Sequence, residues 1–169
     1  VGTLQDISDI GKLVQKKGIL FHTDAVQSVG KIPVDVNDLC VDLLSLSSHK
    51  IYGPKGVGAL FVKRGTPSLF SPVCGGGQEK KRRGGTENVP GIIGFGKACQ
   101  IAQYRLNKGD TEQLKKLRDQ LRKKIKELIP NVKFFGCVEK CLPNTLNCGF
   151  EGADGEELLI ALDMAGISV

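Results

Sequence analysis

Lys50 ends the run Ser47-Ser48-His49-Lys50, which directly follows an apolar segment. A lysine amine can form an imine with an aldehyde cofactor, and hydroxyl and imidazole groups beside it can hold a phosphate. Asp24 ends a second apolar segment, and a carboxylate in that position can pair with a protonated pyridine nitrogen. Together these residue types are the ones that a site for pyridoxal phosphate (PLP) requires.

A third feature is the basic loop between Gly75 and Thr86, which carries Lys80, Lys81, Arg82 and Arg83 between glycines. Glycine makes up 22 of the 169 residues, and clustered loop glycines let a backbone come close to a ligand. Simpler interpretations stay open. Lys50 and the basic run can be solvated loop residues, and Asp24 can cap a short helix from 25 to 29. His22 is expected to be a buried core histidine.

The chemistry-bearing residues need strands and helices to position them. Apolar runs predict buried strands over 19–23, 41–47 and 57–63, with Asp24 and Lys50 just after the first two. Helical spacing predicts helices over 6–17, 91–106 and 114–128, the last preceded by a capping box at Asp110 and Gln113. A strand over 145–150 and a helix over 154–165 follow. The pattern favours a covered sheet in an α/β layer, with a domain boundary near 105–112.

Composition narrows the classes of protein. The net charge is +6, with 24 basic and 18 acidic residues, which favours anionic ligands. Six cysteines without a CxxC pair and two histidines make a metal site hard to assemble, so we expect none, and most thiols should be reduced, buried and inert. The apolar runs are too short to span a membrane and no signal peptide is visible, which predicts a cytoplasmic protein.

Three long motifs resemble the cysteine desulfurases, which are fold-type I PLP enzymes of the class V aminotransferase group. They are HTDAVQSVGKIPVDV (22–36), SSHKIYGPKGVGALFV (47–62) and GGGQEKKRRGGTENVPGIIGFGKA (75–98). The similarity runs in register over essentially the whole chain. It implies that residues 1–108 are the C-terminal part of the large PLP-binding domain, with a mostly parallel sheet. Residues 109–169 would begin the small α+β C-terminal domain, so we expect a piece of a longer polypeptide.

The resemblance also implies site residues. Lys50 would be the lysine that holds PLP covalently, Asp24 would bind its pyridine nitrogen and Gln27 its phenolic oxygen. Ser47 and His49 would hold the phosphate. Thr86 would bind the phosphate of the neighbouring subunit's cofactor, which implies a homodimer. Ser48 stands where relatives often have glycine, and the family's persulfide-forming cysteine and substrate-binding arginine are expected outside these 169 residues.

The function implied is conversion of L-cysteine to L-alanine and an enzyme-bound persulfide. The sulfur would pass to an iron–sulfur cluster assembly scaffold or a tRNA-thiolation protein, and the 169 residues alone are expected to be inactive. A selenocysteine lyase of the same fold is the nearest alternative. A non-catalytic module that binds RNA or an acidic partner through the basic helix is a second alternative, but the aromatic content is only 5% and lacks tryptophan. We therefore expect no direct nucleic-acid binding.

Overall fold

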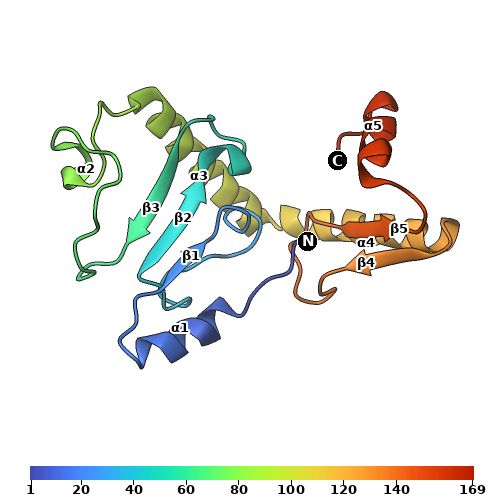
Figure 1. Cartoon of the computed structure of the whole chain (residues 1–169), viewed down its shortest axis with the longest axis horizontal. Helices are drawn as coiled ribbons and strands as arrows, with labels where there is room; N and C mark the ends of the chain where they lie inside the picture. Colours follow the sequence, from blue (N-terminus) through green and yellow to red (C-terminus); the bar gives the residue numbers. More distant parts are fainter. The chain divides into compact units, whose positions relative to one another are not determined.

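The computed structural model describes all of residues 1–169. The chain forms two compact units: residues 6–108 make one, and residues 1–5 together with 109–169 make the other (Figure 1). No helix in the chain is both long enough and apolar enough to cross a membrane.

The unit of residues 6–108 is built on a three-stranded sheet with the order β1-β2-β3 (Figure 1). Strand β1 (His22–Asp24) runs parallel to β2 (Leu43–Ser47), with His22 opposite Leu43. Strand β3 (Gly58–Val62) runs antiparallel to β2, so this part of the sheet is mixed. All three predicted strands are present, each shorter than its apolar run.

Helices and one short 3-10 turn surround this sheet. They are α1 (Ile7–Gln15), η1 (Ser48–Ile51), α2 (Gln78–Lys81) and α3 (Val89–Lys108). Ile51 of η1 packs with Phe95, Ala98 and Ala102 of α3, and this cluster holds the turn after β2 against the helix. A second buried cluster, made by Ala25, Val41 and Leu44, lies around the first two strands.

The other unit contains α4 (Asp110–Leu128), the antiparallel pair β4 (Val132–Phe135) and β5 (Asn147–Phe150), and α5 (Gly155–Met164). Residues 1–5 join it through a β-bridge between Thr3 and Cys141 and a hydrogen bond of 2.8 Å from the Leu142 N–H to the Gly2 carbonyl. Strand β4 was not predicted, and neither was the place of residues 1–5 in this unit.

The starts of the two helices in this unit differ from the sequence predictions. Asp154 was predicted as the first helical residue of α5, but its side chain caps the helix by accepting hydrogen bonds from the N–H groups of Glu156 and Glu157. The capping box at Asp110 is wrong. Gly109, at φ +85°, occupies the cap position without a side-chain bond, and Asp110 is already the first helical residue, where its charge still favours the helix dipole.

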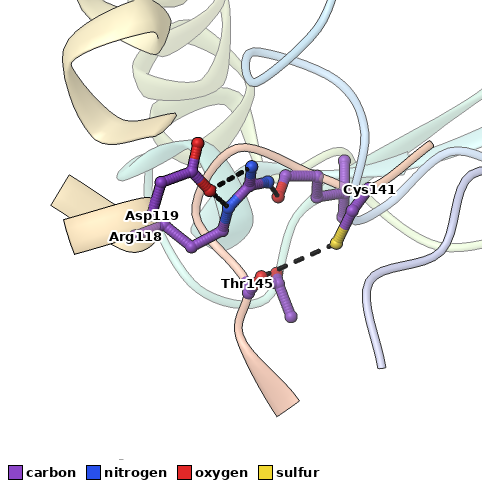
Figure 2. Close-up of polar contacts among 5 residues, drawn as sticks. Arg118, Asp119, Cys141 and Thr145 are labelled. Carbon is purple, nitrogen blue, oxygen red and sulfur yellow. Dashed lines mark hydrogen bonds and ion pairs between the residues drawn. The ribbon is translucent and has the colours of Figure 1, made fainter. Parts of the chain in front are cut away.

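A buried guanidinium ties α4 to the loop before β5 (Figure 2). The side chain of Arg118 is only 8% exposed. Its Nη1 donates to the Leu142 carbonyl at 2.8 Å, and its Nε and Nη2 both donate to Oδ1 of Asp119. In the same loop the Cys141 thiol donates to the Thr145 carbonyl at 3.6 Å. These contacts fix a loop that has no regular secondary structure of its own.

Candidate cofactor site

Two of the predicted site residues end neighbouring parallel strands. Asp24 is the last residue of β1 and pairs with Ser45, and Ser47 ends β2 two residues further on. Parallel strands present their carboxyl ends at one edge of the sheet, which is where open α/β sheets bind ligands. The sheet therefore brings the segments that follow β1 and β2 to the same edge.

The segment after β1 is a tight turn that carries Asp24 and Gln27. Oδ1 of Asp24 accepts a hydrogen bond of 2.8 Å from the Val26 N–H, and the Ala25 carbonyl accepts from the N–H groups of Ser28 and Val29. Asp24 thus makes the short-range hydrogen bond that is expected of a capping residue, although the segment it begins is a turn and not a helix. This bond uses one oxygen of the carboxylate. Because a carboxylate has two oxygens with several acceptor sites, Asp24 keeps acceptor capacity for a ligand.

The segment after β2 carries Ser47, His49 and Lys50. Oγ of Ser47 and Nδ1 of His49 are hydrogen-bonded at 2.9 Å, and Lys50 lies half-buried in η1. The turn ends at Tyr52, whose φ is +64°, and the Gly53 N–H donates to the Ser48 carbonyl. A hydroxyl, an imidazole and an ammonium thus emerge within four residues, a donor set suited to a phosphate and a carbonyl.

A second lysine lies near Lys50. Burial lowers the pKa of Lys31 below its ordinary value, and the positive charge of Lys50 lowers it further. The only hydrogen-bond partner of the Lys31 ammonium is the neutral Gln27 side chain, at 3.0 Å. Because both effects act against the protonated form of Lys31, an anion close to the two lysines would favour that form.

Thr86 is exposed and follows the glycine-rich loop, in which a Cβ added at Gly75 would lie 3.2 Å from the Cα of Gly84. That close approach requires glycine at both positions. No hydrogen bond joins Thr86 to the other five predicted site residues. The structure thus gathers Asp24, Gln27, Ser47, His49 and Lys50 onto two adjacent segments, whereas Thr86 stands apart in sequence and in bonding.

Two predictions about side-chain burial are wrong. His22 is exposed, and its Nε2 lies 2.7 Å from Oγ of Ser45, because β1 turns Thr23 rather than His22 toward the interior. None of the six cysteines is fully buried, and Cys74 and Cys137 are exposed. No cluster of three or more His, Cys, Asp or Glu side chains is arranged to hold a metal ion.

Sequence reasoning also missed Lys31, although it lies inside the first motif. Its signal was the spacing of four residues from Gln27, which can bring two side chains together on a helical turn. Its approach to Lys50 could not be read from the sequence, since nineteen residues separate the two lysines.

Comparison with known proteins decides the family. The model of the family "Aminotransferase class-V" matches residues 1–169. The chain belongs to the class-V aminotransferase family. A cysteine desulfurase IscS of Clostridium botulinum is 47% identical over 99% of this chain and 42% of its own length. A probable mitochondrial cysteine desulfurase of Dictyostelium discoideum is 48% identical over 96% of this chain and 36% of its own length.

A solved structure of a NifS-like protein has a TM-score of 0.93 and 40% identity, and covers 100% of this chain and 46% of the other. The predicted resemblance to cysteine desulfurases and the α/β fold of fold-type I PLP enzymes are thereby confirmed. The chain spans less than half the length of these similar proteins.

PLP is the cofactor of the class-V aminotransferase family, and the residues at the sheet edge fit it. The cofactor carries an anionic phosphate, an aldehyde and a pyridine nitrogen that a carboxylate can keep protonated. Ser47, His49 and Lys50 supply donors and a cation, and Asp24 supplies a carboxylate on the adjacent segment. The positive charges of Lys31 and Lys50 act against one another, and the cofactor's phosphate or phenolic anion would offset this repulsion.

Proposed function

We propose that this chain is part of a PLP-dependent cysteine desulfurase. The supporting observation is the edge of the sheet, where the segments after β1 and β2 present a carboxylate, a hydroxyl–imidazole pair and a lysine. Similar proteins named cysteine desulfurases match nearly all of the chain. In this proposal residues 1–108 belong to the large PLP-binding domain and residues 109–169 to the small C-terminal domain.

Each site residue has a defined task. PLP, when bound, supplies an aldehyde for imine formation and a ring that accepts electrons from the substrate's Cα. Nζ of Lys50 would hold the aldehyde carbon of PLP covalently and would serve as the base for the proton on the substrate's Cα. Asp24 would keep the pyridine nitrogen protonated, Gln27 would donate to the phenolic oxygen, and Ser47 and His49 would hold the phosphate.

The overall reaction is balanced by one acceptor thiol. L-cysteine loses its sulfur and becomes L-alanine, and the thiol that receives the sulfur becomes a persulfide. A thiolate is the nucleophile in such a step. We propose an iron–sulfur scaffold or a tRNA-thiolation protein as the final acceptor, and a homodimer in which Thr86 binds the phosphate of the neighbouring subunit's cofactor.

The proposed location is the cytoplasm. It stays a prediction, since the similar protein from Dictyostelium discoideum is described as mitochondrial.

The test is to trap the cofactor and measure the products. The whole protein is incubated with PLP, reduced with borohydride and digested, and a PLP adduct is expected on the peptide that contains Lys50. The Lys50→Ala variant should lose the adduct and the formation of alanine from L-cysteine. Lys55→Ala, which removes an exposed lysine five residues away, should keep both.

Two outcomes would contradict the proposal. Alanine formation by Lys50→Ala at the wild-type rate would remove Lys50 from the chemistry. A PLP adduct without alanine formation would keep the cofactor and reject the reaction. Rates measured side by side on cysteine and selenocysteine distinguish a desulfurase from a selenocysteine lyase.

A further inference from the structure

The Gln27 side chain is held in one orientation by Lys31. The Lys31 ammonium lies 3.0 Å from Oε1 of Gln27. An ammonium can only donate hydrogen bonds, so the amide oxygen must face it and the amide NH₂ must point the other way. Nε2 of Gln27 makes no hydrogen bond within the chain and remains available as a donor.

The backbone between the two residues is fixed by a close contact with η1. Gly30 has φ +76°, and a Cβ at this position would lie 2.8 Å from Cγ2 of Ile51 and 3.1 Å from Cβ of Ala102. The Lys31 N–H donates to the Ser28 carbonyl at 3.0 Å. The turn that carries Gln27 and Lys31 therefore packs directly against the segment that carries Lys50.

Two electrostatic effects act against the ammonium of Lys31 at this place. Partial burial and the charge of Lys50 both disfavour its protonated form, and they lower its pKa. The hydrogen bond of 3.0 Å to Oε1 of Gln27 is the contact that favours the ammonium there. The contact with Gln27 is therefore the interaction through which Lys31 can act.

We propose that Lys31 is a positioning residue that locks the Gln27 amide with its NH₂ toward the phenolic oxygen of bound PLP. The inference rests on the proposed function. Without Lys31 the amide can rotate by half a turn and present its oxygen to an anionic oxygen, which turns an attraction into a repulsion. Lys31 thus acts through Gln27, in addition to its general positive charge.

The first experiment compares Lys31→Met, Lys31→Arg and Lys97→Met in the whole protein. Two properties of bound PLP are read: its dissociation constant, and the pH midpoint of its absorption change. A donor on the phenolic oxygen favours the deprotonated form, so its loss should raise the midpoint in Lys31→Met. PLP binding should weaken about three- to tenfold, as for the loss of one ordinary hydrogen bond.

Lys31→Arg keeps a cationic donor, so its PLP dissociation constant and its pH midpoint should both stay close to the wild-type values. Lys97 is an exposed lysine on α3, so Lys97→Met should behave as the wild type. The unfolding temperature measured without PLP distinguishes a structural role of Lys31 from its proposed role in positioning Gln27. Lys31→Met should unfold at no lower temperature than the wild type, because it removes an unfavourably placed charge.

The second experiment is a double-mutant cycle with Gln27→Leu. If Lys31 acts through Gln27, adding Lys31→Met to Gln27→Leu should change the midpoint by much less than Lys31→Met does alone. Full additivity of the two substitutions would overturn the inference, because a purely electrostatic effect of Lys31 needs no Gln27. So would an unchanged midpoint in Lys31→Met.

The two proposals fail in different ways. If the wild type binds no PLP, the proposed function is rejected and the role of Lys31 toward PLP is rejected with it. If the wild type binds PLP and forms alanine from L-cysteine while the cycle is additive, only the role of Lys31 is rejected.

Discussion

At the scale of single residues, Ser48 carries the clearest energetic conflict. Its side chain is 0% exposed and its Oγ has no hydrogen-bond partner. A Cβ at Gly53 would collide with that hydroxyl and lie 2.9 Å from Cβ of Ala98, so the hydroxyl is enclosed by α3 and the turn after η1. An unsatisfied buried hydroxyl opposes folding.

We therefore expect Ser48→Ala to stabilise the protein by about 1 kcal/mol, since it removes an unpaired polar group and keeps Cβ. The free energy of unfolding in urea measures this. Ser71→Ala is the control, because Oγ of Ser71 donates to the Val73 carbonyl at 2.9 Å and its loss should destabilise slightly. A less stable Ser48→Ala would show that the hydroxyl has a partner.

The thiols of Cys99 and Cys148 should be alkylated more slowly than the exposed thiols. Burial raises the pKa of the thiols of Cys99 and Cys148 above the ordinary value, so at neutral pH a smaller fraction is thiolate, the reactive form. Exposed Cys74 and Cys137 should be alkylated first by iodoacetamide, and the difference should narrow as the pH rises toward the raised pKa values. Peptide mass spectrometry at several reaction times shows the order in which the cysteines are alkylated. Alkylation of Cys99 as fast as Cys74 would contradict it.

At the scale of elements, the turn after β1 depends on Gly30. We expect Gly30→Ala to destabilise the protein by about 2 kcal/mol, through its positive φ and through contact with Ile51 and Ala102. Gly18→Ala is a matched control, because Gly18 has φ +66° but open space around it. The difference in unfolding free energy between the two variants isolates the contact. Equal losses would mean that the turn can move away from η1.

The loop before β5 depends on α4 through Arg118. Arg118→Met keeps the aliphatic stem but leaves the Leu142 carbonyl without its donor, and should destabilise this unit by about 2 kcal/mol. Hydrogen exchange should quicken at the amides of Leu142 and Thr145. The control, Lys123→Met, removes an exposed pair with Glu127 and should change stability little. Unchanged exchange in Arg118→Met would show that the loop is held by other contacts.

At the scale of the whole molecule, α3 exposes several apolar side chains, among them Val89, Ile92, Ile93 and Tyr104. Such exposure is compatible with a surface covered in an oligomer. In the proposed homodimer, Lys50 and Thr86 would act on one cofactor from different subunits. Variants at the two positions should therefore complement one another in mixed dimers.

Lys50→Ala and Thr86→Ala should each impair the homodimer, whereas a mixture of the two should recover activity. In a random mixture half of the dimers carry both variants, and one of their two sites is intact, so about a quarter of the wild-type activity is expected. Turnover of L-cysteine after co-expression measures it. Activity no higher than the average of the two single variants would place Lys50 and Thr86 on the same subunit's cofactor.

Local patterns were enough for most elements and for the residues that follow the strands. Apolar runs located β1, β2 and β3, and helical spacing located α1, α3, α4 and α5. Asp24 lies at the end of β1 and Lys50 just after β2, close to where the sequence placed them, since a strand end and its next residues are neighbours in sequence.

The tertiary structure decided what depends on distant neighbours. It turned His22 outward onto Ser45, left the six thiols incompletely buried, and showed that Gly109 rather than Asp110 occupies the N-cap position of α4. It also brought Lys31 within electrostatic range of Lys50, where the turn packs through Gly30 on Ile51. Sequence spacing is silent on such contacts, because the packing of one segment on another, and not either segment alone, sets the distance between their charges.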